Sequence, residues 1–132
     1  MVVLIVDDEP VVAESTAAVF RHAGHSAYSA TSAVEALTLA YEVNPDLLIS
    51  DVVMPGFSGI DLAIELLARI PNCKVLLISG QAQTADLLEG AAERGYHFEI
   101  AAKPLWPPDL IRQAEEIVGR DESSDAATAS SS

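Results

Sequence analysis

Residues 47–59, LLISDVVMPGFSG, combine a short apolar run, a carboxylate and a turn. Pro45 precedes the run and Pro55 and Gly56 follow it, so the run is too short for a helix and predicts a buried strand ending near Asp51. In an open α/β sheet, ligands bind outside the carboxyl ends of the strands. Asp51 is therefore placed for chemistry, although an Asp after a strand is often only a turn former or a helix cap.

Four further strands are expected around this one, each followed by a helix. The expected strands are residues 2–6, 26–30, 47–51, 74–78 and 98–102. Five strands that alternate with five helices predict a doubly wound parallel (βα)5 sheet with helices on both faces. Strands 26–30 and 98–102 carry polar residues and are expected at the edges. The strand order 2-1-3-4-5 is then the natural candidate, and other orders with the same edges stay open.

Helical spacing predicts which side chains face the sheet. The positions are Val11, Val12, Ser15, Val19 and Ala23 in the first helix, Val34, Leu37, Ala40 and Tyr41 in the second, Ile60, Ala63, Ile64 and Leu67 in the third, Leu87, Leu88, Ala91 and Ala92 in the fourth, and Leu110, Ile111, Ala114, Ile117 and Val118 in the fifth. Pro10 suits the first turn of the first helix, and Gly24, Gly95 and Gly119 are expected to end the first, fourth and fifth helices.

Length and charge narrow the class of protein. The chain has 132 residues, enough for one domain, which we expect at 1–119. Residues 120–132 have no large apolar side chain and predict a disordered acidic, Ser- and Ala-rich tail. Twenty acidic against seven basic residues give a formal charge of -13, which disfavours direct binding to nucleic acid or anionic membrane. With no apolar run long enough for a membrane span and no secretory signal pattern, we expect a cytoplasmic protein.

Polar residues follow four of the expected strands: Asp7 and Asp8 after the first, Asp51 after the third, Ser79 after the fourth and Lys103 after the fifth. Three carboxylates at one sheet edge repel one another unless a cation lies among them. Mg²⁺, which keeps several waters, suits two or three carboxylates. A hydroxyl, a lysine and a metal beside an exposed carboxylate match phosphoryl transfer, with Asp51 as a nucleophile that becomes an acyl phosphate.

Four motifs carry a resemblance to a known family. They are Val-Asp-Asp-Glu-Pro at 6–10, Asp51-Val-Val-Met-Pro with Gly59 eight residues after the Asp, Ser79-Gly80, and Lys103-Pro104. Together they resemble the receiver domain of two-component response regulators, in a CheY-like, stand-alone form, over about residues 2 to 119. The resemblance implies a flavodoxin-like fold of strand order 2-1-3-4-5 and phosphorylation of Asp51 by a histidine kinase.

The same resemblance implies roles for the matching positions. Asp8, Asp51 and the backbone carbonyl of Val53 would ligate Mg²⁺, Asp7 would act through bound water, Ser79 and Lys103 would each bind a phosphoryl oxygen, and Gly59 and Pro104 would support the site. The bond between Lys103 and Pro104 is expected to be cis. The partners implied are a histidine kinase or a phosphotransfer protein, and a downstream protein that binds the surface of the fourth helix, fifth strand and fifth helix.

This chain departs from the family at its switch position. The family commonly has Phe or Tyr three residues before the lysine, whereas this chain has Ile100, and Phe98 is out of register. We therefore expect the coupling of Ser79 to the output surface to be weakened, or to run through the hydroxyl and its loop alone. The resemblance also places Val53 and Gln81 at two variable positions that, in this family, influence how water reaches the acyl phosphate. An apolar Val53 predicts slow self-dephosphorylation.

Three functions remain open at this point. The favoured one is a phosphorylation-controlled protein-binding switch or phosphoryl shuttle, which is not an enzyme acting on other substrates. An aspartyl phosphohydrolase of the haloacid dehalogenase type would want a second acid two residues after the nucleophile, where this chain has Val53. A constitutive receiver-fold scaffold would not need phosphorylation, but the complete acidic set argues against it. A receiver cut from a longer regulator is also compatible with the sequence.

Overall fold

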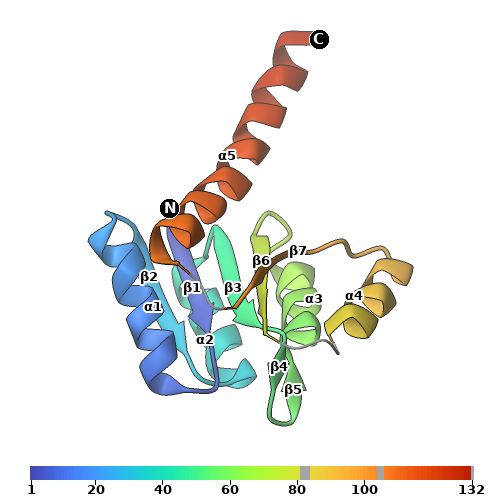
Figure 1. Ribbon diagram of the computed structural model, residues 1–132. Helices are drawn as coiled ribbons and strands as arrows, with labels where there is room; N and C mark the ends of the chain where they lie inside the picture. Colours follow the sequence, from blue (N-terminus) through green and yellow to red (C-terminus); the bar gives the residue numbers. More distant parts are fainter. Residues whose placement is uncertain (81–83, 104–105, 132) are drawn as a thin grey trace.

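The computed structural model describes residues 1–80, 84–103 and 106–131. A parallel sheet of five strands forms the centre of the molecule (Figure 1). Its strands are β1 (Val2–Val6), β2 (Ser26–Ala30), β3 (Leu47–Asp51), β6 (Lys74–Ser79) and β7 (Glu99–Ala102). They lie in the order β2-β1-β3-β6-β7, with all four pairings parallel. The predicted fold class, strand order and edge strands are confirmed.

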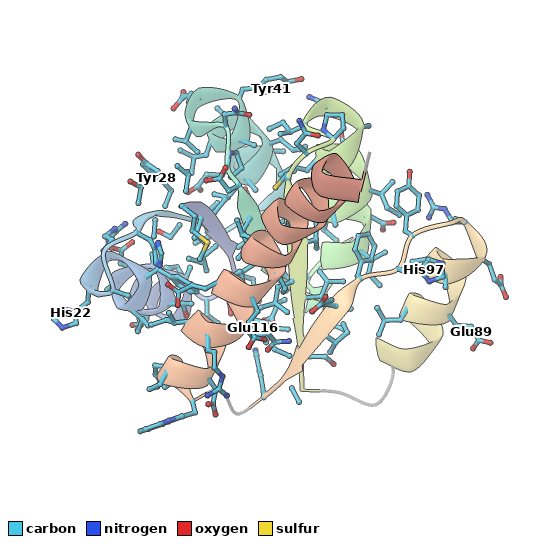
Figure 2. The ribbon with its side chains drawn as sticks, turned by 90° about the horizontal axis from the view of Figure 1, so that it is seen from above. His22, Tyr28, Tyr41, Glu89, His97 and Glu116 are labelled. Carbon is cyan, nitrogen blue, oxygen red and sulfur yellow. The ribbon has the colours of Figure 1, made fainter. Side chains whose placement is uncertain are left out.

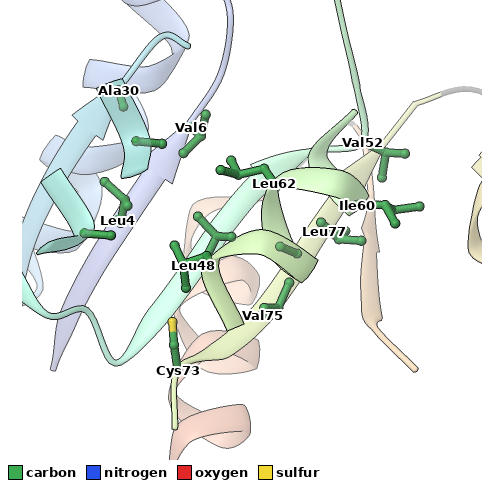
Figure 3. Close-up of a cluster of buried hydrophobic side chains, with 14 of the residues drawn as sticks. Leu4, Val6, Ala30, Leu48, Val52, Ile60, Leu62, Cys73, Val75 and Leu77 are labelled. Carbon is green, nitrogen blue, oxygen red and sulfur yellow. The ribbon is translucent and has the colours of Figure 1, made fainter. Parts of the chain in front are cut away.

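Helices cover both faces of this sheet, as right-handed crossovers require. They are α1 (Pro10–His22), α2 (Ala33–Val43), α3 (Gly59–Arg69), α4 (Thr84–Glu93) and α5 (Pro107–Ser131). One apolar cluster joins the sheet to α2, α3 and α4, and Figure 3 shows Leu48 and Leu77 of the sheet beside Leu62 of α3 in it. The second cluster joins the opposite face to α1 and α5. Strands buried on both faces read as continuous apolar runs, as β1, β3 and β6 do.

Side-chain caps explain where two of the helices begin. The Ser32 hydroxyl accepts a hydrogen bond from the backbone N–H of Glu35 at the start of α2. The Ser58 hydroxyl accepts from the N–H groups of Ile60 and Asp61 at the start of α3. Each hydroxyl satisfies donors that the first helical turn leaves unpaired. Ser58 thereby fixes the first turn of α3 beside the end of β3.

The predicted inward faces of the first two helices are wrong in part. On α1 the buried residues are Ala13, Ala17 and Phe20, whereas Val11 is 78% exposed. On α2 the buried residues are Ala36 and Ala40, whereas Val34 and Tyr41 are exposed. Both helices carry two stripes at helical spacing, one large and apolar, the other mostly of alanine. The alanine stripe faces the sheet because small side chains let a helix approach it closely, which leaves the larger ones in solvent.

The third and fifth helices follow their predicted faces more closely. Ile60 and Ala63 are buried on α3, but Leu62 and Leu66 are buried as well, and Ile64 and Leu67 are only half-buried. On α5 the buried residues are Leu110, Ala114 and Ile117, with Ile111 and Val118 packed against them. The amphipathic spacing therefore located α5 correctly.

One helix boundary and one additional element differ from the sequence-based expectation. Helix α5 has no end at Gly119 and continues through Ser131, past the edge of the sheet opposite the ends of β1 and β3 (Figure 1). A glycine inside a helix costs only about 1 kcal/mol relative to alanine, and residues 120–131 contain no proline, so nothing local stops the helix. The disorder that the composition of residues 120–132 predicts stays a prediction. The short antiparallel hairpin of β4 (Val53–Met54) and β5 (Phe57–Ser58) was also not predicted.

Within the described residues, no helix combines the length and apolar character that crossing a membrane requires.

Candidate functional site

The site lies where the parallel strands end, because all their carboxyl ends meet at one edge of the sheet. Asp7 and Asp8 follow β1, Asp51 ends β3, Ser79 ends β6 and Lys103 follows β7. One carboxylate oxygen from each of the three aspartates lies within 4.8 Å of the other two. The structure therefore brings together the acidic residues that the sequence placed at separate strand ends.

A lysine closes this acidic group on one side. The Nζ of Lys103 lies 3.0 Å from Oδ1 of Asp51 and donates a hydrogen bond to Oδ2 at 3.1 Å. The Asp51 side chain is 12% exposed and the Lys103 side chain 41%. The ammonium thus contacts both oxygens of a carboxylate that solvent still reaches.

The charges of the site shift its pKa values. Burial raises the pKa of Asp51, the hydrogen bond from Lys103 opposes that rise, and the negative charge of Asp7 adds to it. For Lys103, burial lowers the pKa, but its hydrogen bond and attraction to Asp51 outweigh that effect and leave the pKa raised. One ammonium therefore does not offset the cost of holding Asp51 ionised beside Asp7. A bound cation would favour the ionised form.

Asp7 is held rigidly, whereas Asp8 faces solvent. Asp7 is buried, its Oδ1 accepts a hydrogen bond from the N–H of Glu9 at 2.9 Å, and its own N–H donates to the carbonyl of Ala30 at 3.2 Å. Asp8 is exposed. One fixed acid and one accessible acid beside Asp51 suit a cation that retains part of its water shell.

Gly59 is required by close packing against the strand that carries Asp51. A Cβ added at Gly59 would lie 2.0 Å from the backbone oxygen of Asp51, so any side chain would displace the strand end. The N–H of Gly59 also donates to the carbonyl of Val52 at 2.8 Å. The spacing of eight residues between Asp51 and Gly59 is therefore the length of chain that forms the hairpin and returns to the site.

The remaining predicted positions surround this centre. Lys103 N–H donates to the carbonyl of Ser79 at 2.9 Å, which joins the ends of β6 and β7. Ile100 is half-buried on β7 and packs against the cluster formed with α3 and α4, and Val53 is 42% exposed beside Asp51. Gln81 and Pro104, and with Pro104 the expected cis bond, lie outside the described residues.

The histidines do not offer an alternative metal site in the described part of the chain. His22 lies on α1 and His97 precedes β7, on opposite sides of the molecule (Figure 2). His25 lies between the N-terminal ammonium and Glu115, at 3.1 and 3.0 Å. Cys73, the single cysteine, is buried, and burial raises the pKa of its thiol to about 12. Cys73 is therefore a core residue and not a metal ligand in this structure.

One residue of the site was missed from the sequence. Ser50 is fully buried and donates a hydrogen bond to the backbone carbonyl of Asp51 at 2.9 Å. The signal was a polar residue at an inward position of an otherwise apolar strand, which is uncommon unless the hydroxyl has a partner.

Comparison with known proteins agrees with this geometry. Residues 3–115 match the model of the response regulator receiver domain. This chain is a member of that family. It is 33% identical over 118 residues to the probable transcriptional regulatory protein TcrX of Mycobacterium tuberculosis, covering 89% of this chain and 50% of TcrX. It is 29% identical over 120 residues to the DNA-binding response regulator MtrA of Mycolicibacterium smegmatis, covering 91% of this chain and 51% of MtrA.

Solved receiver structures share the whole fold. The response regulator receiver domain protein of Clostridium thermocellum superposes with a TM-score of 0.80 at 26% identity, covering 92% of this chain and 96% of that one. The receiver spans about half the length of the curated relatives it matches. The chain therefore has the fold of a receiver from two-component signalling, and Asp51 stands at the end of the third strand of its central sheet.

Proposed function

We propose that this receiver accepts a phosphoryl group on Asp51 from a histidine kinase or a phosphotransfer protein, and that the group controls binding to a downstream protein or passes onward in a relay. The observation that carries the proposal is the contact of Lys103 with both oxygens of Asp51, beside Asp7 and Asp8. A carboxylate with only a structural role would be destabilised by two further acids within ligand distance, because like charges repel.

The chemistry follows from the residues at the strand ends. An oxygen of the Asp51 carboxylate forms the new bond to phosphorus while the N–P bond of the donor phosphohistidine breaks, and the imidazole nitrogen keeps the electron pair and takes a proton. Lys103, released from the free carboxylate, pairs with an oxygen of the transferred group, and the hydroxyl of Ser79 binds another. The result is an acyl phosphate at an edge of the sheet that a partner can reach.

The residues present fit Mg²⁺ as the cofactor. Receiver domains bind Mg²⁺ at an acidic pocket, and Asp7, Asp8 and Asp51 supply the oxygen ligands that this ion prefers. Asp8, Asp51 and the carbonyl of Val53 would hold it, with Asp7 acting through water. When bound, the ion offsets negative charge on the phosphoryl oxygens and on the carboxylates. Burial and the charge of Asp7 raise the pKa of Asp51, and a bound cation would oppose that rise.

A constitutive scaffold remains the second candidate because of Ile100. This residue occupies the switch position without an aromatic ring, and it is already half-buried against the α3 and α4 side of the core. Tyr96 and Phe98 stack on each other with ring centroids 6.0 Å apart, earlier in the same segment. A half-buried aliphatic side chain has less surface left to bury on activation than an exposed aromatic ring would have.

The deciding experiment is incubation with acetyl phosphate, with and without Mg²⁺, followed by intact-mass analysis of the wild type and Asp51→Asn. We expect a Mg²⁺-dependent gain of one phosphoryl group that the variant lacks. A parallel titration with beryllofluoride, followed by amide shifts on α4, β7 and α5, tests the switch. No adduct together with no beryllofluoride binding would reject the proposal in favour of the scaffold.

The environment of Val53 sets the expected lifetime of the phosphoryl group. Val53 is 42% exposed, and its apolar side chain cannot orient a water molecule toward the phosphorus. We expect self-dephosphorylation to take minutes or longer, and Val53→Asn to shorten the lifetime several-fold. Loss of the phosphoryl mass followed over time after removal of acetyl phosphate measures both, and a wild-type lifetime of seconds would contradict the prediction.

A further inference from the structure

Ser50 is a fully buried hydroxyl inside the apolar run of β3. Its cross-strand neighbours are Val6 on β1 and Leu77 on β6, and both belong to the apolar cluster drawn in Figure 3. A hydroxyl in such surroundings costs free energy unless it is hydrogen-bonded. Among the side chains that the structure describes, no buried polar atom lacks a partner, and Ser50 meets this condition through the carbonyl of Asp51.

The hydrogen bond of Ser50 belongs to a set that holds the main chain as it leaves Asp51. The carbonyl of Asp51 accepts from Ser50, and the N–H of the same peptide unit, that of Val52, donates to the carbonyl of Ile78 at 3.0 Å. The next carbonyl, of Val52, accepts from Gly59. Three successive backbone groups are thus fixed, and one of the anchors is the residue directly before Ser79.

We propose that Ser50 is a positioning residue for phosphoryl transfer: its hydroxyl fixes the Asp51–Val52 peptide plane and so aims the Asp51 carboxylate and the Val53 carbonyl at a common cation. The inference rests on the proposed function. Rotation of this peptide would change the backbone on either side of it, at the phosphoacceptor and at the residue that offers the carbonyl ligand. Ser50 acts through these groups and touches no reacting atom itself.

A packing role for Ser50 makes the opposite prediction. The position of an added Cβ at Gly59 lies 2.8 Å from Oγ of Ser50, so the space around the hydroxyl is tight. If Ser50 only filled a small space, Ser50→Ala would leave Mg²⁺ affinity and phosphorylation unchanged, and the larger Ser50→Cys would weaken both. If the hydrogen bond matters, Ser50→Ala is the more harmful, because the thiol of Cys remains a weak donor.

The test compares wild type, Ser50→Ala and Ser50→Cys, with Ser29→Ala as the matched control. Ser29 is a serine of the edge strand β2 whose hydroxyl donates to Glu14 at 2.8 Å. The readouts are amide hydrogen exchange at Val52 and Gly59 in the metal-free protein, the Mg²⁺ dissociation constant from an NMR titration, and the rate of phosphorylation by acetyl phosphate.

For Ser50→Ala we expect faster exchange at both amides. The Mg²⁺ dissociation constant should rise about tenfold and the phosphorylation rate should fall about tenfold. Tenfold is the lower end of the effects seen when a group that orients a metal ligand is removed. Ser50→Cys should lie between Ser50→Ala and wild type, and Ser29→Ala should match wild type. Thermal unfolding of each variant shows that it is folded. If Ser50→Ala does not fold, a Mg²⁺ dissociation constant in Ser50→Cys that lies between the wild-type value and a tenfold increase supports the role.

Three results would overturn the role of Ser50. They are wild-type Mg²⁺ affinity and amide exchange in Ser50→Ala, a loss of Mg²⁺ affinity in Ser29→Ala equal to that in Ser50→Ala, and a greater loss of Mg²⁺ affinity in Ser50→Cys than in Ser50→Ala. These three apply when Ser50→Ala folds. Where it does not fold, an unchanged Mg²⁺ affinity in Ser50→Cys overturns the role. A wild type that binds Mg²⁺ but takes neither a phosphoryl group nor beryllofluoride would defeat the proposed function alone. The exchange and Mg²⁺ measurements would still decide the role of Ser50.

Discussion

The two ends of the sheet treat charge in opposite ways. At the ends where the strands start, groups of opposite character are paired: His25 lies between the N-terminal ammonium and Glu115, and a carboxylate oxygen of Asp46 accepts from the N–H of Val2 at 2.7 Å. At the carboxyl ends, three aspartates lie together, and Lys103 contacts one of them, Asp51. The polar groups at the first end have partners within the chain, whereas the clustered carboxylates at the second end would be stabilised by a bound cation. Substitutions at the first end should change stability alone, and those at the second should change binding.

The largest effect is expected from Asp8→Asn at the carboxyl ends. Asp8 is exposed and its carboxylate lies within 4.8 Å of a carboxylate oxygen of Asp7 and of Asp51. Loss of one charged ligand should raise the Mg²⁺ dissociation constant about 100-fold, which corresponds to about 2.7 kcal/mol. Isothermal titration calorimetry measures it. The thermal stability of the metal-free protein should change little, since an exposed acid is removed, and unchanged Mg²⁺ affinity would show that Asp8 is not a ligand.

His25→Ala probes the opposite end. The ring of His25 contacts the ring of Phe20 at 6.3 Å between centroids, and both of its nitrogens have polar partners. The substitution should lower the free energy of unfolding by about 2 kcal/mol, within the range for loss of a partly buried, hydrogen-bonded group. Urea denaturation measures the change. Mg²⁺ affinity and phosphorylation should stay at wild-type values, and a shift in either would mean that the two ends are coupled.

Asp51→Asn should stabilise the metal-free protein. Because the pKa of Asp51 is raised, its contribution to stability is present below the unfolded-state value near 3.8 and is lost as pH rises through the folded-state value. A neutral side chain avoids that loss at pH 7, and a gain of about 1 kcal/mol would raise Tm by about 3 °C. The advantage of Asn should vanish near pH 3, where Asp51 is itself protonated. Thermal unfolding at both pH values, without Mg²⁺, gives the comparison, and a lower Tm for Asp51→Asn at pH 7 would reverse the sign.

The sequence predicted the strands and the acidic site because both depend on short-range patterns. Continuous apolar runs marked β1, β3 and β6, and the motif residues fall at strand ends that the topology necessarily brings together. The faces of α1 and α2 were harder, since Val11 and Ala13 are both apolar and only the distance to the sheet decides between them. Ser50 was missed for a related reason: its polar side chain at an inward strand position could be read from the sequence, but the partner of its hydroxyl, a backbone carbonyl, could not.

The smallest effect is expected from removal of residues 120–132. Residues 120–131 continue α5 beyond the sheet at the edge opposite Asp51 (Figure 1), and the sequence from 120 onward has no large apolar side chain. A helical segment without apolar side chains gains little from packing, so isolated helical propensity has to maintain it and the ends fray. The shortened chain should therefore keep its Tm within about 1 °C, well below the effect of a 1 kcal/mol change, and its Mg²⁺ affinity should match the full chain. Amide exchange along α5 of the full chain shows why Tm and Mg²⁺ affinity stay unchanged in the shortened chain. Rapid exchange after Gly119 supports the disorder expected from composition. Protection through residue 131 would mean that the extension is a stable helix.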